Sequence, residues 1–245
     1  MATSKVFEGE QTILFIGKTG SGKSRLINLL AQEKIAESRQ STDSVTSSCK
    51  LYSISANNIS YRMIDTIGVA DTNLTDDQVV AKIKGFLKLE THYVNSVIVV
   101  LNGTDKLTRE TTRAIDLILS FLNLAKYKNE VLFCITHADW WNSDVKKKYI
   151  DEIVAVASFN KFKDVVIKNT IFIGAPDPKD VVPALQKAAE AEEKVVRRAL
   201  LEKLPTQNPP ILRDEITAWR ELDMQNKLHN QVGAARLILS TCTIL

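Results

Sequence analysis

Apolar runs of strand length alternate with helical patterns along the first 175 residues. The alternation of apolar and polar positions predicts helices over 23–35, 76–90, 107–124 and 144–160. Strands are predicted over 11–16, 49–55, 59–64, 94–101, 131–135 and 170–173. The run over 94–101 is almost continuously apolar, which is typical of a strand covered on both faces.

This order of elements predicts an α/β fold with three layers. Strands that alternate with helices form a mostly parallel sheet, and Asn57-Asn58 between two strand patterns predicts one antiparallel hairpin strand. We expect an N-terminal tail over 1–10, the α/β domain over 11–180 and a helical extension over 181–245.

The extension contains two helical patterns separated by prolines. The first carries an apolar stripe among charges, and the second begins near Arg213. Such stripes either pack against the adjoining domain or bind a partner. The stripe residues are Leu185, Ala189, Val196, Leu200 and Leu204.

Composition narrows the class of protein. The 245 residues are 44% hydrophobic and carry a net charge of +3, so charge alone indicates no nucleic-acid partner. Three cysteines lack metal-ligand spacing, and Cys134 lies in an apolar run where a buried thiol is expected. No run reaches the length of a membrane span, and the N-terminus lacks the apolar core of a signal peptide. We therefore expect a cytoplasmic protein.

The main candidate for chemistry is the segment from Gly17 to Ser24. It matches the phosphate-loop pattern G-x-x-x-x-G-K-[ST] between a strand and a helix. Glycines let successive N–H groups face an anion, and the helix adds its positive end. Lys23 is expected at the β- and γ-phosphates, with Ser24 as a Mg²⁺ ligand. The predicted contacts of this loop are Gly17, Lys18, Thr19, Gly20, Ser21, Gly22, Lys23, Ser24 and Arg25.

Asp65-Thr66-Ile67-Gly68 ends the second hairpin strand. An aspartate there holds Mg²⁺ through a water, and Gly68 frees a backbone N–H for a γ-phosphate. The alternative is an ordinary turn.

Asp139 follows the strand over 131–135 and is the candidate for base recognition. A carboxylate accepts hydrogen bonds from both N1–H and the 2-amino group of guanine, which adenine does not offer. The alternative is a helix N-cap for the segment that begins near Asn142. After the last strand, Gly174-Ala175 forms a tight loop able to close over a base.

Taken together, these motifs resemble those of the AIG1-type GTPases, an immune-associated family related to chloroplast import receptors, in the septin-like branch. The resemblance covers about 11–175 and implies a P-loop GTPase fold that binds GTP or GDP with Mg²⁺. It implies that Thr46 is the switch residue that binds Mg²⁺, with Thr42, Ser44 and Ser47 as competitors. It also assigns the guanine motif to Thr136 and Asp139, and the final motif to Gly174 and Ala175.

The family also carries an extra box, here 101–110, from which some members offer an arginine across a nucleotide-dependent dimer. Lys106 occupies that position, so the resemblance implies a homodimer through the nucleotide face. Alternatively, Lys106 and Arg109 are solvated charges at a helix start.

Two departures from the GTPase pattern matter. His137 replaces the lysine that covers the base, so its imidazole would stack instead, as in the related import receptors. Val69 and Ala70 follow Gly68 where other GTPases carry a glutamine that orients the attacking water. We therefore expect slow hydrolysis of GTP. The alternative is a GTP-dependent oligomerising scaffold with little or no hydrolysis.

The last four residues, from Cys242, fit a prenylation signal of the geranylgeranyl type. One such chain gives weak membrane attachment, so the protein would be cytoplasmic and peripherally membrane-bound. The alternative is a chance ending.

Overall fold

The computed structural model describes residues 10–36, 48–69, 74–105, 108–139, 141–174, 178–179, 181–204 and 209–226. Six strands form one sheet in the order β2-β3-β1-β4-β5-β6. Neighbouring strands run parallel, except that β2 pairs antiparallel with β3. The strands are β1 (Glu10–Gly17), β2 (Lys50–Ala56), β3 (Ile59–Asp65), β4 (Ser96–Asn102), β5 (Val131–Thr136) and β6 (Thr170–Phe172). The predicted α/β fold with one antiparallel hairpin strand is confirmed.

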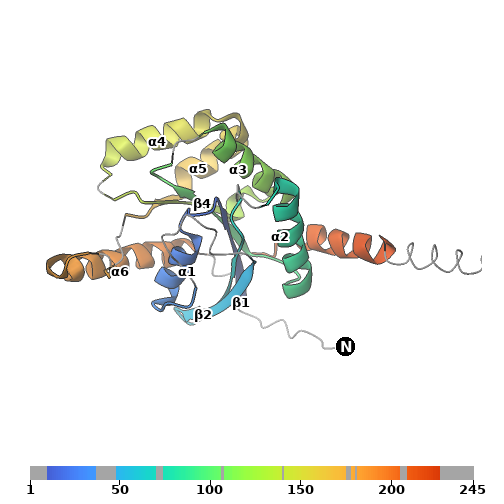
Figure 1. Cartoon of the computed structure of the whole chain (residues 1–245), viewed down its shortest axis with the longest axis horizontal. Coiled ribbons are helices and arrows are strands. Elements are labelled where there is room, and N and C mark those ends of the chain that lie inside the picture. Colours follow the sequence, from blue (N-terminus) through green and yellow to red (C-terminus); the bar gives the residue numbers. More distant parts are fainter. Residues whose placement is uncertain are drawn as a thin grey trace, which may run out of the picture.

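Helices cover both faces of the sheet (Figure 1). They are α1 (Lys23–Ala31), α2 (Asp76–Glu90), α3 (Arg109–Phe121), α4 (Ser143–Ala155), α5 (Lys163–Lys168) and α6 (Gln186–Lys203), and residues 213–226 are also helical. Short 3₁₀ turns lie at Leu124–Lys126, Lys128–Glu130, Ala157–Phe162 and Pro183–Leu185.

Alternate residues of the strands pack into two hydrophobic cores, one on each face of the sheet. On β1, Ile13 and Phe15 face a core formed with α1 and α6, whereas Leu14 and Ile16 face a larger core formed with α2, α4 and α5. Successive side chains on a strand point to opposite faces, so near-continuous apolar strands such as β4 supply both cores.

Three helix predictions were wrong at their ends. The helix predicted over 23–35 ends at Ala31, because Gln32 takes a left-handed conformation at φ 58°. The helix predicted over 144–160 ends at Ala155, and α5 follows it unpredicted. Within α4, the apolar residue Val145 is 42% exposed, although the helical spacing of apolar positions over 144–160 predicts that it faces inward. The helix predicted over 107–124 ends at Phe121.

The C-terminal helices pack against the domain on opposite faces of the sheet (Figure 1). Leu200 and Leu204 of the predicted stripe are buried in the core with α1, but Leu185 is 53% exposed and does not belong to that stripe. Ile216 is buried in the other core. Among the described residues, no helix is both long and apolar enough to cross a membrane.

Candidate functional site

The loop from Gly17 to Ser24 joins the carboxyl end of β1 to the first turn of α1. Gly20 and Gly22 have φ values of 78° and 92°, a backbone region that favours glycine. A Cβ on Gly17 would lie 2.3 Å from the carbonyl oxygen of Val100, so only glycine fits there. No side chain caps the helix at Gly22. The open N-terminal turn of α1 therefore offers N–H groups to an anion.

Lys23 and Asp65 are buried charges beside this loop. Lys23 Nζ donates to the carbonyl oxygens of Gly17 (3.1 Å) and Lys18 (3.2 Å). Burial lowers the pKa of Lys23, and the charge of Asp65 opposes that shift. Burial raises the pKa of Asp65, opposed by Lys23 and by the hydrogen bond from Ser24.

The Ser24–Asp65 pair fits a Mg²⁺ site. Ser24 Oγ donates to Asp65 Oδ2 at 2.6 Å, while Asp65 Oδ1 is buried without a hydrogen-bond partner. A buried oxygen without a partner is costly. Hydroxyl and carboxylate oxygens are the ligands that Mg²⁺ takes in proteins, so this pair would hold the ion.

The backbone after Asp65 lies directly on the loop. Val69 N donates to the Gly17 carbonyl oxygen at 3.1 Å, and Thr19 N donates to the Val69 carbonyl oxygen at 3.3 Å. A Cβ on Gly68 would lie 2.1 Å from Thr19 Oγ1 and 2.4 Å from Thr19 N, so this close approach requires a glycine.

Thr136 joins the end of β5 to the loop. Its hydroxyl donates to the carbonyl oxygen of Ser21 at 2.8 Å. His137 follows with a positive φ of 53° and an exposed ring whose Nδ1 lies 3.0 Å from Thr136 Oγ1. The sequence placed Thr136 in the guanine motif but gave no sign of this brace.

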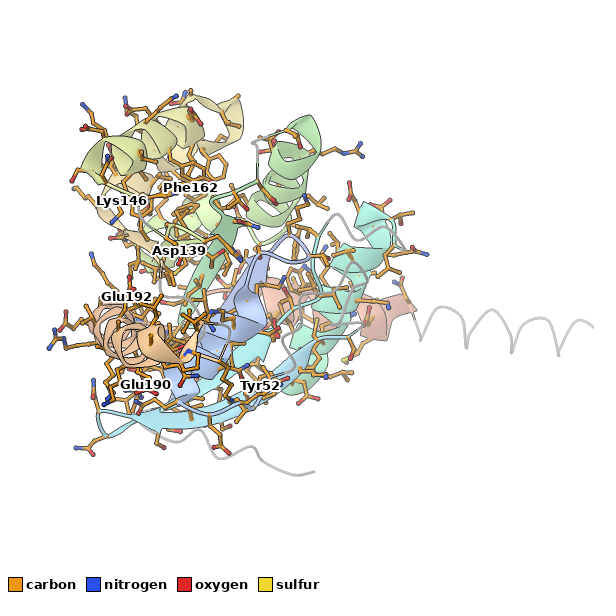
Figure 2. All side chains as sticks on the ribbon, turned by 60° about the vertical axis from the view of Figure 1, so that its left-hand side comes forward. Tyr52, Asp139, Lys146, Phe162, Glu190 and Glu192 are labelled. Atoms are coloured by element: carbon orange, nitrogen blue, oxygen red, sulfur yellow. The ribbon has the colours of Figure 1, made fainter. Side chains whose placement is uncertain are left out.

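Asp139 is half-buried and not a helix cap. The cap of α4 is Asn142, whose side chain accepts a hydrogen bond from Val145 N at 2.9 Å, so the N-cap alternative for Asp139 was wrong. Within the part of the chain that the structure describes, the Asp139 carboxylate has no hydrogen bond or ion pair. Figure 2 shows Asp139 between Lys146 on α4 and Glu192 on α6.

Gly174 closes the site beside Asp139. A Cβ there would lie 2.8 Å from the Ala138 carbonyl oxygen and 3.0 Å from Asp139 Cα. Gly174, which follows β6, thus lies against the backbone of the predicted guanine motif.

The predicted residues are distributed as follows. Thr46, Lys106, Ala175 and Cys242 lie outside the described residues, as do Thr42, Ser44 and Ser47. The side chain of Lys18 pairs with Asp105 (Nζ to Oδ2, 3.4 Å), and that of Arg25 pairs with Glu193 of α6 (Nη2 to Oε1, 3.4 Å). The remaining predicted residues meet at the carboxyl edge of the parallel strands, where α/β proteins bind their ligands.

Trp141 was not predicted to belong to this region. Its ring packs edge-on against Tyr149, with centroids 5.0 Å apart, and a Cβ on Gly103 would lie 2.9 Å from Trp141 Cη2. Trp141 therefore connects the turn after β4 to the segment that carries Asp139. No periodicity in the sequence indicates this contact.

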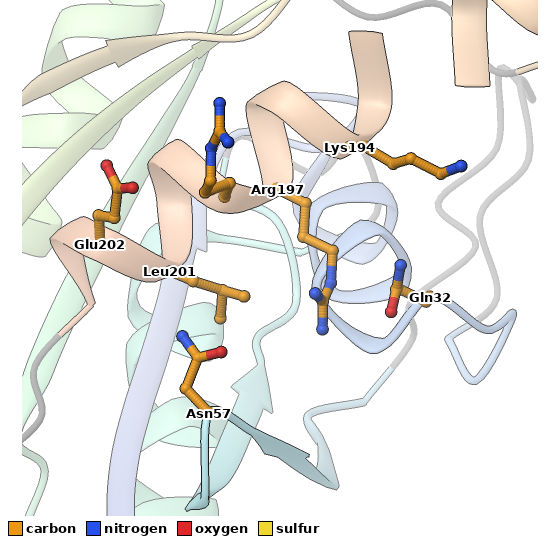
Figure 3. A pocket seen from close by; sticks show the side chains of 7 residues that line it. Gln32, Asn57, Lys194, Arg197, Leu201 and Glu202 are labelled. Carbon is orange, nitrogen blue, oxygen red and sulfur yellow. The ribbon is translucent and has the colours of Figure 1, made fainter. Parts of the chain in front are cut away.

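A separate hollow of about 430 Å³ lies between α6, the end of α1 and the β2–β3 turn (Figure 3). Lys194, Arg197 and Arg198 line it together with Glu202. Arg197 is fixed there by a hydrogen bond from Nε to the Leu30 carbonyl oxygen (3.0 Å). This hollow lies at the opposite edge of the sheet from the loop, and no predicted site residue lines it.

Solved structures with this fold include GTPases. Toc33 from Arabidopsis thaliana, in a dimerization-deficient mutant, is 20% identical with a TM-score of 0.56, covering 83% of this chain and 88% of that one. Era from Aquifex aeolicus, bound to GDP and aluminium fluoride, is 19% identical with a TM-score of 0.54, covering 82% and 59%. At these sequence identities, the similarity to Toc33 and Era shows a shared fold.

Two curated relatives come from Arabidopsis thaliana. Immune-associated nucleotide-binding protein 13 is 29% identical over 102 residues, and immune-associated nucleotide-binding protein 7 is 27% identical over 101 residues. Each match covers 41% of this chain, but only 30% and 32% of the relatives. The model of the AIG1 family matches residues 11–170. The chain therefore belongs to the AIG1 family.

Proposed function

We propose that this protein is a GTP-binding switch that hydrolyses GTP to GDP slowly. The observation that carries the proposal is the meeting of three features at one edge of the sheet: the glycine loop with Lys23, the Ser24–Asp65 pair, and the carboxylate of Asp139. Among the described residues, that carboxylate has no hydrogen bond or ion pair. Membership of the AIG1 family and the fold shared with Toc33 and Era support it.

Guanine recognition rests on Asp139. Its carboxylate has the two acceptors that N1–H and the 2-amino group of guanine require. The brace from Thr136 to Ser21 holds the base-recognition segment at a fixed distance from the phosphate loop, so base and phosphates are recognised together. We propose that His137, which is exposed beside them, stacks on the base.

Phosphate binding rests on the loop and its lysine. Loop N–H groups hold the β-phosphate, and Lys23 neutralises charge at the β–γ bridge. Mg²⁺, when bound at Ser24 and Asp65, neutralises further charge on the phosphates. Thr46 completes this set as the proposed switch residue.

Hydrolysis is proposed to be slow because the position after Gly68 lacks a glutamine. Val69 is buried and apolar, so its side chain cannot orient water. We further propose that a homodimer through the nucleotide face accelerates the reaction, with Lys106 as the cation offered in trans. Dimerisation is important for the GTPase activity of the chloroplast translocon components atToc33 and psToc159, and the structure that carries this finding shares the fold of this chain. This supports the proposed homodimer.

The test is turnover of GTP and of ATP over a series of protein concentrations. We expect GTP to be hydrolysed, ATP not, and turnover per molecule to rise with concentration. Lys106→Ala should remove that rise, whereas Lys128→Ala, an exposed charge at the opposite edge of the sheet, should keep it. Equal use of ATP contradicts guanine selectivity. Turnover that stays near zero at every concentration supports the GTP-dependent scaffold instead.

A further inference from the structure

The buried hydroxyl of Thr19 has no hydrogen-bond partner among the residues that the structure describes. The side-chain oxygens in this state within the described residues are Gln11 Oε1, Thr19 Oγ1, Ser21 Oγ and Asp65 Oδ1. A buried polar oxygen without a partner destabilises a fold, so such atoms mark places where a ligand can supply the missing partner.

Thr19 lies where the phosphate loop meets the backbone after Asp65. Its Oγ1 is in contact with Gly68, since a Cβ there would lie 2.1 Å away. Its N–H is bonded to the Val69 carbonyl oxygen at 3.3 Å. In a triphosphate held by the loop and Lys23, the γ-phosphate is the end that Gly68 approaches. Thr19 therefore flanks the side from which water must attack.

The other oxygens without partners are placed differently. Ser21 Oγ lies 2.7 Å from the position of a Cβ on Gly17, so it faces the strand beneath the loop. Asp65 Oδ1 belongs to the proposed metal site, and Gln11 lies near the opposite end of β1. Thr19 is the one of the four that faces Gly68.

Hydrolysis of GTP requires a group that positions the attacking water, and a hydroxyl can fill that role. Water must be held in line with the bond from the γ-phosphorus to the bridging oxygen, and glutamine does this in other GTPases. Here Val69 cannot do so. A hydroxyl both accepts and donates hydrogen bonds, so it is able to hold water against a phosphate oxygen.

We propose that Thr19 positions the attacking water for hydrolysis of GTP, a role that rests on the proposed function. Thr19 Oγ1 accepts a hydrogen bond from the water, and its hydroxyl donates a hydrogen bond to a γ-phosphate oxygen while keeping its proton. The water oxygen bonds to the γ-phosphorus, and the bond to the bridging oxygen breaks. A water proton passes to the phosphate, so the products are GDP and inorganic phosphate.

The test compares Thr19→Val, which keeps the shape and removes the hydroxyl, with Thr19→Ser, which keeps the hydroxyl. Single-turnover hydrolysis should fall about 100-fold in Thr19→Val and return to within about threefold of the parent in Thr19→Ser. Affinity for GDP and for a non-hydrolysable GTP analogue should stay within about threefold in both variants. Binding of aluminium fluoride with GDP, a transition-state analogue, should weaken in Thr19→Val alone.

Each contrary outcome has its own meaning. An unchanged rate in Thr19→Val overturns the role of Thr19 while the GTPase proposal stands. Loss of analogue affinity together with rate assigns Thr19 to nucleotide binding and also overturns the role. A parent chain that binds GTP without hydrolysing it, at every concentration, ends both this role and the proposed hydrolysis. Melting temperatures of all three proteins show whether the fold is intact.

Discussion

At the scale of single residues, the candidate site contains two buried ionisable side chains, Asp65 and Lys23. Asp65 has 1% of its surface exposed and Lys23 has 6%, and burial opposes the charged form of each. Their mutual attraction and the hydrogen bond from Ser24 offset part of that cost. Groups with shifted pKa values cluster at functional sites, and here they lie beside the proposed sites of the γ-phosphate and the metal.

A pH dependence follows from the raised pKa of Asp65. Between its ordinary value of 3.8 and its higher folded value, the folded state binds more protons than the unfolded state. Stability contributed by that proton is present at low pH and is lost as the pH rises. The free energy of unfolding of the nucleotide-free parent should therefore fall relative to Asp65→Asn as the pH rises from about 4. Denaturant titrations of both proteins measure this, and a difference that is flat or grows with pH contradicts it.

Gly68→Ala should loosen the backbone that lies on the phosphate loop. The new Cβ would meet Thr19 Oγ1 at 2.1 Å and Thr19 N at 2.4 Å, and overpacking of this kind costs about 1–3 kcal/mol. Gly85→Ala is the matched control, since nothing lies within 4 Å of its Cβ and alanine favours the α2 helix by about 1 kcal/mol. Denaturant titrations should show a lower free energy of unfolding for Gly68→Ala and a higher one for Gly85→Ala. Equal effects would mean that Gly68 is not in close contact.

Substitutions of Asn142 and Asp139 should have separate effects, one on the stability of the fold and the other on the affinity for GTP. Asn142→Ala removes the cap of α4 and should cost about 1 kcal/mol of unfolding free energy, with GTP affinity unchanged. Asp139→Ala removes no hydrogen bond or ion pair among the described residues, so stability should hold while GTP affinity is lost. Calorimetry and denaturant titration measure the two quantities. The idea fails if Asp139→Ala costs as much stability as Asn142→Ala.

At the scale of elements, periodicity predicted the strands within a few residues because buried strands leave a strong apolar pattern. It missed the end of α1, since the side chain of Asn28 bonds the backbone of Ala36 in both directions (2.8 and 2.7 Å) and turns the chain back. It also missed the end of α4. There Phe159 and Phe162 turn edge-on to Phe133 in the core, a tertiary contact that local spacing does not reveal.

The helix over 213–226 is tied to α2 through Arg220. Its Nε donates to the Lys88 carbonyl oxygen (2.8 Å) and its Nη2 to the Thr91 carbonyl oxygen (2.7 Å). Arg220→Ala should therefore lower the free energy of unfolding by about 1–3 kcal/mol, whereas Arg198→Ala, an exposed residue of α6, should change it by less than about 0.5 kcal/mol. If both variants melt like the parent, the helix contributes no stability through Arg220.

At the scale of the whole molecule, motifs separated by more than a hundred residues meet at one edge of the sheet. The sequence predicted this meeting because the carboxyl ends of parallel strands share an edge. It did not predict the contacts between motifs. These are the hydrogen bond from Thr136 to Ser21 and the close approaches of Gly68 to Thr19 and of Gly174 to Ala138. Such contacts depend on strand order, which the residue pattern leaves undetermined.

The most direct measurement is nucleotide binding by Asp139→Asn. In xanthine a carbonyl replaces the 2-amino group of guanine, so an asparagine amide can donate to it while its carbonyl accepts from N1–H. We predict that calorimetry will show the parent binding GTP but neither ATP nor XTP, and Asp139→Asn binding XTP in place of GTP. A parent that binds ATP as tightly as GTP, or a variant that keeps its affinity for GTP, would contradict a guanine-nucleotide site built on Asp139.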